Sequence, residues 1–297
     1  MKYITIAKDL KFSRIIQGFW RLNEWNLSTT ALKEMMEACI ERGVTTFDTA
    51  EIYGHGDCEI QLGNVLKTYP NLRQQIQLVS KTGISLAKVN GNVMGYYDTT
   101  YDHIIQACKD SLERLHCEYL DLYLIHREDP CIDHHAVAKA LKDLQTMGLI
   151  RYYGVSNFGP FKFNALQTCT NNNLKTNQIE WNPICFEHFD NGMMDVLMEQ
   201  QIPPMIWSPV AGGEIFKNDN PLCVNAMVVL KELAKKYDCD VDTIIYAWIL
   251  YHPVQAMPIV GSSKIERLDK AIAALDISLD HFDWYRIYTA SKQQILR

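Results

Sequence analysis

Four polar side chains near the ends of short apolar runs could together protonate a carbonyl oxygen. Asp48, Lys81 and His126 each end such a run, and Tyr53 follows shortly after the first. A tyrosine is a poor acid at neutral pH because its pKa is about 10, and a nearby ammonium lowers that pKa by stabilising the phenolate. A carboxylate would keep the lysine charged, and a histidine could orient the carbonyl. These residue types predict proton transfer to a carbonyl oxygen while a hydride arrives at its carbon.

Each of these side chains also has a purely structural explanation. Asp48 could cap the segment after it, and Tyr53 could be an aromatic at a barrel rim with its hydroxyl in water. Lys81 could be a solvated lysine at a strand end, and His126 a buried imidazole bonded to the backbone. The chemical interpretation therefore requires a fold that brings these strand ends to one place.

Alternating strand-like and helical patterns predict such a fold. The strand-like runs are apolar and only weakly alternating, as is typical of parallel strands buried on both faces. Helical spacing fills the gaps, over 30–42, 101–116, 134–147, 227–237, 241–251 and 265–275. Eight strands, each followed by helix, predict a closed (β/α)8 TIM barrel, as one domain over residues 1–297. The predicted strands are 15–18, 45–48, 76–81, 120–126, 151–156, 176–181, 205–207 and 256–260.

Further segments would surround this barrel. We expect a small N-terminal β-hairpin from 3–6 and 11–13, and an extra C-terminal helix over 281–294. Two long stretches, 82–99 and 212–222, are expected to form mobile loops over the barrel mouth.

An open doubly wound sheet is the main alternative fold. Such a sheet would usually carry G-x-G-x-x-G near its first strand to bind a dinucleotide. Gly54-His55-Gly56 lacks the third glycine at the right spacing, and the Walker pattern is also absent. The sequence therefore favours the barrel.

Composition and charge exclude several other classes of protein. The chain has 297 residues, and 29 Lys and Arg against 35 Asp and Glu give a formal charge of −6. That balance disfavours nonspecific binding to nucleic acids or anionic membranes. No apolar run approaches the roughly 18 residues of a membrane span, and the stretch 3–7 is too brief for a secretory segment. The nine scattered cysteines contain no C-x-x-C pair, so we expect reduced thiols in the cytoplasm and no metal site.

Seven segments resemble, in order, motifs of the aldo-keto reductase family. They run from about Gly18 to Arg267, which is nearly the whole chain. One such segment is moderately specific, whereas seven in register are highly specific. The segments are FDTAEIYG at 47–54, VSK at 79–81, DLYLIH at 121–126, GVSNF at 154–158, QIEWNP at 178–183, WSP at 207–209 and GSSKIER at 261–267.

The resemblance implies an NADPH-dependent oxidoreductase that reduces an aldehyde or ketone, as a small-molecule substrate, to an alcohol. Tyr53 would donate the proton, tuned by Lys81 and Asp48, and His126 would position the carbonyl. Cations beside hydroxyls would meet the adenosine phosphate, which implies a preference for NADPH over NADH. The implied cofactor-binding residues are Ser156, Asn157, Gln178, Trp207, Ser208, Pro209, Ser262, Ser263, Lys264 and Arg267.

Some of these positions also have simpler explanations, and others depart from the family pattern. Taken alone, an indole at a strand end could be core packing, and 262–267 could be an ordinary solvated helix start. Arg127 follows the fourth-strand histidine where many relatives have tryptophan, and Lys270 stands where the family often has glutamate near the adenine. Trp20 is expected to line the substrate pocket. Arg21 and Arg127 could favour an anionic carbonyl substrate or pair with buried Glu or Asp, and ion pairing is the slightly favoured expectation.

Other functions stay open at this level. A regulatory protein could keep the barrel and the cofactor but couple to a partner with little turnover, as the potassium-channel β subunits do. A metal-dependent barrel hydrolase would need His-x-His after the first strand, where residues 16–19 offer none, and a serine hydrolase would need a second glycine near Ser156. Neither the physiological substrate nor the oligomeric state follows from the sequence.

Overall fold

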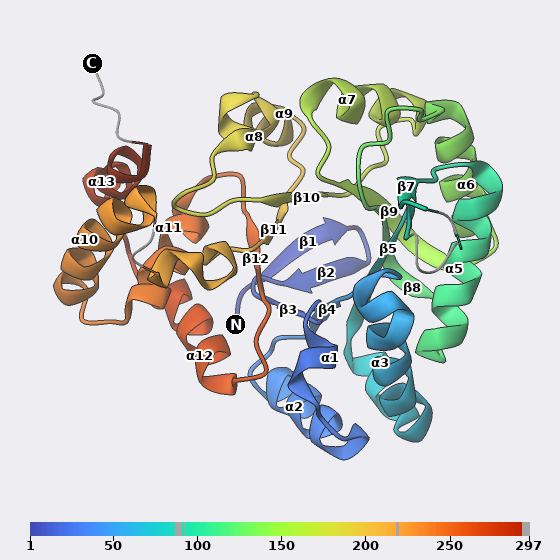
Figure 1. The fold of residues 1–297 in the computed structure, drawn as a ribbon, viewed down its shortest axis with the longest axis horizontal. Coiled ribbons are helices and arrows are strands. Elements are labelled where there is room, and N and C mark those ends of the chain that lie inside the picture. Colours follow the sequence, from blue (N-terminus) through green and yellow to red (C-terminus); the bar gives the residue numbers. More distant parts are fainter. Residues whose placement is uncertain (87–90, 92, 218–219, 293–297) are drawn as a thin grey trace.

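A closed barrel of eight parallel strands forms the centre of the molecule in this computed structural model (Figure 1). The structure describes residues 1–86, 91, 93–217 and 220–292. Each barrel strand lies on one of the predicted apolar runs, so the predicted (β/α)8 architecture is confirmed. In barrel order the strands are β3 (Ile16–Gly18), β4 (Thr46–Asp48), β5 (Gln77–Thr82), β8 (Leu120–Ile125), β9 (Ile150–Ser156), β10 (Asn177–Glu180), β11 (Met205–Trp207) and β12 (Met257–Val260), which pairs with β3.

The burial of β8 explains why these strands read as continuous apolar runs. All six of its residues are buried, because the barrel interior covers one face and the outer helices cover the other. Leu122 and Leu124 belong to the apolar cluster that fills the barrel. Tyr123 and Ile125, which alternate with them, pack in the larger cluster with the helices.

The predicted N-terminal hairpin is confirmed as β1 (Tyr3–Ala7) and β2 (Leu10–Ser13). Its Leu10 and Phe12 are buried in the same cluster as the barrel residues Val79 and Leu122. Since β2 leads directly into the start of β3, the hairpin closes the amino end of the barrel, and Figure 1 shows it across the barrel centre. The carboxyl ends of the strands remain as the mouth, where barrel enzymes carry their sites.

Helices surround the barrel, and side-chain caps set where several of them begin. Ser28 Oγ accepts a hydrogen bond from Ala31 N–H at one helix start, and Asn220 does the same for Leu222 N–H at another. The second helix therefore begins at Pro221 rather than at residue 227, as apolar spacing alone predicted. The longer helices are α2 (Thr29–Glu41), α3 (Asp57–Thr68), α5 (Tyr101–Leu115), α6 (His134–Thr146), α7 (Pro160–Cys169), α10 (Pro221–Lys236), α11 (Val241–Tyr251) and α12 (Ile265–Ala273).

Several elements lie outside the predicted pattern. The helices α3 and α7 were not predicted, and Gly63 inside α3 shows why: glycine is a poor helix former, yet a Cβ there would lie 1.9 Å from the Arg114 carbonyl oxygen. The close packing of α3 against α5 thus overrides propensity. The short elements are α1 (Leu22–Trp25), α8 (Glu187–Asp190), α9 (Met193–Glu199), η1 (Tyr53–Gly56), η2 (Pro70–Gln75), η3 (Ala211–Phe216) and η4 (Ala274–Asp276).

The extra C-terminal helix is present as α13 (His281–Lys292), and the last two residues predicted for it lie outside the described residues. Trp284 of α13 and Trp248 of α11 each donate their indole N–H to the other's backbone carbonyl, at 3.0 and 3.1 Å. The stretch 82–99, predicted as a loop, contains the paired strands β6 (Ile84–Ser85) and β7 (Tyr96–Tyr97), and residues 87–90 and 92 lie outside the described part. Within the described residues, no helix has the length and apolarity to cross a membrane.

Candidate active site

The ammonium group of Lys81 joins three of the four predicted catalytic residues at the barrel mouth. Lys81 lies near the end of β5 and is fully buried. Its Nζ donates to Asp48 Oδ2 at 2.8 Å, to the Thr49 carbonyl at 2.7 Å and to the Tyr53 hydroxyl at 3.2 Å. The structure thus brings Asp48, Tyr53 and Lys81 together, as the sequence predicted.

A tight turn places Tyr53 over this lysine. Tyr53 begins η1, and the two residues after it, Gly54 and His55, both have a φ of 58°. Glycine fits this left-handed turn without strain, and there is no room for a side chain, because a Cβ on Gly54 would lie 2.2 Å from Asn23 Nδ2. The turn therefore fixes the direction in which the phenol leaves the backbone.

Burial and charge set the protonation of the Lys81 and Tyr53 pair. Burial pulls the pKa of Lys81 down, but Asp48 and Tyr53 together raise it above its usual value, so Lys81 is charged at pH 7. Burial raises the pKa of Tyr53, although Lys81 acts in the opposite direction. The predicted lowering of the phenol pKa by the ammonium is present, but desolvation outweighs it. Tyr53 holds its proton at pH 7.

His126 completes the group from the end of β8. It is buried, and its ring lies edge-on to the Tyr53 ring with 5.8 Å between centroids. Burial, followed by the charges of Lys81 and Arg127, holds the pKa of His126 well below its usual range. The imidazole is therefore neutral at pH 7, and a neutral imidazole can donate one hydrogen bond to a carbonyl oxygen.

A second set of predicted residues forms a hydrogen-bonded chain across the floor of the mouth. Trp207 Nε1 donates to Asn157 Oδ1 at 2.9 Å, and Asn157 Nδ2 donates to Ser156 Oγ at 2.8 Å. Ser156 Oγ donates to the Gln178 carbonyl at 2.9 Å, and Gln178 Nε2 donates to Asp48 Oδ1 at 2.7 Å. Asn157 has a φ of 60°, which lets it turn back over the barrel after β9. The chain leaves Gln178 Oε1 as an acceptor with no partner among the described residues.

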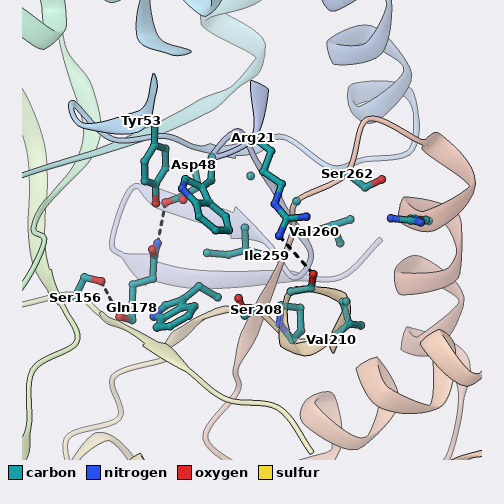
Figure 2. A pocket seen from close by; sticks show the side chains of 18 of the residues that line it. Arg21, Asp48, Tyr53, Ser156, Gln178, Ser208, Val210, Ile259, Val260 and Ser262 are labelled. Carbon is teal, nitrogen blue, oxygen red and sulfur yellow. Dashed lines mark hydrogen bonds between the residues drawn. The ribbon is translucent and has the colours of Figure 1, made fainter. Parts of the chain in front are cut away.

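Most of these groups line one pocket with a volume of about 710 Å³. Figure 2 shows Tyr53 and Asp48 on one side and Ser262 on the other, with Arg21 between them. Lys81 lies beneath the pocket and does not line it. Ser263 and Lys264 do not line it either, and the Lys264 side chain is exposed. The predicted residues that do line it are Trp20, Asp48, Tyr53, His126, Arg127, Ser156, Asn157, Gln178, Trp207, Ser208, Pro209, Ser262 and Arg267.

Several lining residues were not among the predicted site residues. Asp242 and Tyr246 come from α11, and they are spaced one helical turn apart on one face, which is the only sequence signal that could have marked them. Phe216 and Gly212 come from η3, within the stretch predicted to cover the mouth. Lys270, which stands where the family often has glutamate, forms an ion pair: its Nζ lies 3.4 Å from Asp240 Oδ2.

The slightly favoured ion pairs of Arg21 and Arg127 are not found among the described residues. Neither guanidinium has a carboxylate within 4.0 Å among the residues that the structure describes. Arg21 Nη2 donates to the Gly212 carbonyl at 3.4 Å, and its Cζ lies 5.1 Å from the centroid of a Trp20 ring that is 58% exposed. Arg127 Cζ lies 5.9 Å from the Trp207 ring centroid. Both cations therefore face the pocket without a counter-ion from the described chain.

Comparison with known proteins gives the family. The model of the aldo/keto reductase family matches residues 14–292. The chain belongs to the aldo/keto reductase family. This aldo/keto reductase is an oxidoreductase, and the reduction of carbonyl groups is general for its family. The resemblance seen in the seven sequence motifs is thereby confirmed.

Individual relatives cover almost the whole of this aldo/keto reductase. An uncharacterized oxidoreductase, YcsN of Bacillus subtilis, is 42% identical over 98% of both chains. The oxidoreductase YdhF of Escherichia coli is 41% identical over 97% of both, and a 6-dehydroglucose reductase of Agrobacterium fabrum is 36% identical over 97% of both. A crystal structure of a thermostable aldo-keto reductase superposes with a TM-score of 0.83 at 22% identity, over 98% of this chain and 100% of that one, and supports the fold.

Proposed function

We propose that this aldo/keto reductase uses NADPH to reduce an aldehyde or ketone to an alcohol, with Tyr53 as the proton donor. One observation carries the proposal: a single buried ammonium, on Lys81, bonds both the carboxylate of Asp48 and the hydroxyl of Tyr53 at the end of the pocket. A solvated lysine or a simple helix cap would not produce this arrangement.

The residues that line the pocket suit a nicotinamide dinucleotide in their chemistry. Gln178 Oε1 has no hydrogen-bond partner within the described part of the chain and could accept from an amide, and Trp207 offers an indole for stacking. Arg21, which Figure 2 shows between Tyr53 and Ser262, and Arg267, which lines the same pocket, are cations with no ion pair among the described residues, as a pyrophosphate and a further phosphate would require. When bound, the cofactor would supply a hydride to the carbonyl carbon.

The side chains would handle the proton. Tyr53 would donate its hydroxyl proton to the carbonyl oxygen, and Lys81 would stabilise the phenolate that remains. Asp48 would keep Lys81 charged and in place. His126, neutral at pH 7, would donate a hydrogen bond to the same carbonyl oxygen and so align it with Tyr53. Because the phenol pKa is raised, the proton is present before the reaction begins.

A preference for NADPH over NADH is part of the proposal. Ser262 and Arg267 line the end of the pocket opposite Tyr53, at the start of α12. A guanidinium beside a hydroxyl suits a 2′-phosphate, which NADH lacks. Lys264 stands close by in sequence but outside the pocket, so it would contribute by long-range charge alone.

A cofactor-binding regulatory protein with little turnover is the second candidate, because it could share every contact described so far. Measured turnover distinguishes the reductase from the regulatory protein. The test is NADPH oxidation by the purified protein across aldehydes, ketones and quinones, with sugar-derived aldehydes included because a 36% identical relative is a 6-dehydroglucose reductase. We expect reduction of at least one aldehyde class.

Tyr53→Phe assigns the proton donor within the same experiment. Removing a positioned general acid should lower turnover by roughly 10²–10⁴-fold, while fluorescence titration shows unchanged NADPH binding. Tyr251→Phe, at a partly exposed tyrosine outside the pocket, is the matched control. If Tyr53→Phe turns over normally, the proton comes from elsewhere and this role is wrong.

A further inference from the structure

Arg127 stands out as a charge that neither the fold nor the proposed proton transfer uses. It follows His126 directly after β8, lines the pocket and is partly buried. Arg127 interacts electrostatically with the carboxylate of Glu180. It lowers the pKa of Glu180, although burial raises that pKa by more. Glu180 instead accepts a hydrogen bond from Asn182 Nδ2 at 3.1 Å and forms no ion pair with Arg127 within the described chain.

At the catalytic end of the pocket, Arg127 is therefore a charge without an ion pair among the described residues. Lys81 and Asp48 neutralise each other, and His126 and Tyr53 are both neutral at pH 7. The charge of Arg127 is left over, in a chain whose formal net charge is −6. Arg127 shifts the pKa of both Tyr53 and His126, so its field reaches the groups that would hold the carbonyl.

The guanidinium of Arg127 lies over the Trp207 ring, a contact that does not use its hydrogen-bond donors. Its carbon lies 5.9 Å from the Trp207 ring centroid, which is a cation–π distance. Trp207 is itself fixed by its hydrogen bond to Asn157. Among the described residues, no acceptor takes an N–H from Arg127, so the donors of its planar fork are not used within the described part of the chain. That geometry matches the two oxygens of a carboxylate or phosphate.

We propose that Arg127 binds an anionic group on the carbonyl substrate, so that the protein prefers acidic aldehydes or ketones to neutral ones of the same shape. The inference rests on the proposed function, since it concerns the substrate of that same site. The anionic group would lie a few bonds from the carbonyl, because Arg127 neighbours His126 in the chain and Trp207 in the pocket wall. Carboxylates and phosphates share the required chemistry.

Matched pairs of substrates test this preference. Succinic semialdehyde against butanal examines the carboxylate, and glyceraldehyde 3-phosphate against glyceraldehyde examines the phosphate. For the wild type with NADPH we expect kcat/KM to favour the anionic member of at least one pair by about 10- to 100-fold. Arg127→Gln should bring that ratio close to one, mainly through a higher KM, and Arg127→Lys should restore part of it.

Lys109→Gln is the matched control, because it removes one positive charge from an exposed residue outside the pocket. It should leave the ratio unchanged. Equal kcat/KM for both members of each pair in the wild type would overturn the proposal. So would a ratio that Arg127→Gln leaves intact.

A binding measurement separates this inference from the proposed function. Benzoate and benzamide have similar shapes, and their binding to the NADPH-loaded protein can be followed by tryptophan fluorescence. We expect benzoate to bind more tightly, and Arg127→Gln to remove the difference. If no carbonyl is reduced but this difference is present, the proposed function fails while the anion site stands. If aldehydes are reduced but benzoate and benzamide bind equally, the anion site fails alone.

Discussion

The side-chain amide of Gln178 donates a 2.7 Å hydrogen bond to Asp48 Oδ1, while Lys81 bonds the other oxygen of the same carboxylate at 2.8 Å. Asp48 ends β4, Gln178 lies in β10 and Lys81 in β5, so one buried carboxylate ties three parts of the barrel mouth together. The predicted cofactor-binding residue Gln178 is thus bonded directly to the predicted catalytic group.

Asp48→Asn should break this tie and destabilise the protein. An amide has only one acceptor oxygen, whereas Lys81 and Gln178 both approach as donors, so one of them would face an N–H group. The buried ammonium also loses its counter-ion. We expect a loss of about 3 kcal/mol in the free energy of unfolding, measured by urea denaturation. Turnover should fall as well, because burial alone lowers the pKa of Lys81.

The matched comparison is Asp9→Asn. Asp9 pairs with Arg151 at 3.0 Å, but its side chain is 64% exposed. Exposed pairs contribute about 1 kcal/mol or less, so this variant should remain close to the wild type. If both variants lose a similar free energy of unfolding, the burial of the Asp48–Lys81 pair does not make its disruption more destabilising.

Lys81→Met should suppress turnover and move phenol ionisation to higher pH. Lys81 is the main group that opposes the effect of burial on the pKa of Tyr53, so its removal leaves desolvation unopposed. Methionine keeps much of the side-chain volume. The test is the pH dependence of kcat/KM together with ultraviolet titration of tyrosine. A profile unchanged in height and midpoint would remove Lys81 from the site.

The barrel and the core of the site could be predicted because both follow from local patterns. Parallel strands buried on both faces leave apolar runs, and the residues that end them must meet at one mouth, as Asp48 and Lys81 do. The helix α3 was missed because its Gly63 is chosen by packing against Arg114 of α5 rather than by helix propensity. The bond from Gln178 to Asp48 joins strands on opposite sides of the barrel, so no local pattern encodes it.

The partners of the charged side chains also could not be predicted from the sequence. An arginine and a glutamate in one chain suggest an ion pair, such as Arg127 with Glu180. The structure shows that Glu180 accepts a hydrogen bond from Asn182 instead. Tyr246 lines the pocket from α11. The continuous apolar sequence of this helix predicts only that it packs in the core. In each instance the missing information is the direction in which a side chain leaves its element.

The structure separates the two cations predicted to bind the cofactor phosphate. Both side chains are exposed, but Arg267 lines the pocket and Lys264 does not. Arg267→Ala should therefore weaken NADPH binding by about 10-fold or more, with a smaller effect on NADH, because a charge-assisted hydrogen bond is lost. Lys264→Ala should change NADPH affinity much less, and both effects should shrink at high salt. Calorimetric titration of both cofactors measures this. Equal wild-type affinity for NADH and NADPH would exclude a phosphate site here.

The buried carboxyl of Glu51 should make stability depend on pH. Its side chain is 11% exposed, and Oε1 accepts a hydrogen bond from Gly83 N–H at 3.0 Å. Burial raises its pKa from 4.5 to about 7, helped by Glu59 and opposed by the Thr82 side chain, the Gly83 amide and Arg114. His103 Nε2 lies 4.0 Å from Glu51 Oε1. Because the pKa is higher in the folded state, the neutral carboxyl favours folding at low pH. That contribution is lost as pH rises from 4.5 to about 7.

Glu51→Gln tests this, since the amide oxygen can still accept from Gly83 but never ionises. The variant should gain stability relative to the wild type by about 2–3 kcal/mol between pH 5 and pH 8, because the wild type must carry a buried anion at the higher pH. Urea unfolding at both pH values measures the difference. Glu118→Gln, at an exposed carboxyl, controls for removal of a negative charge. If the Glu51→Gln difference is the same at pH 5 and pH 8, the carboxyl ionises in the folded protein as readily as in the unfolded chain, and burial does not govern its pKa.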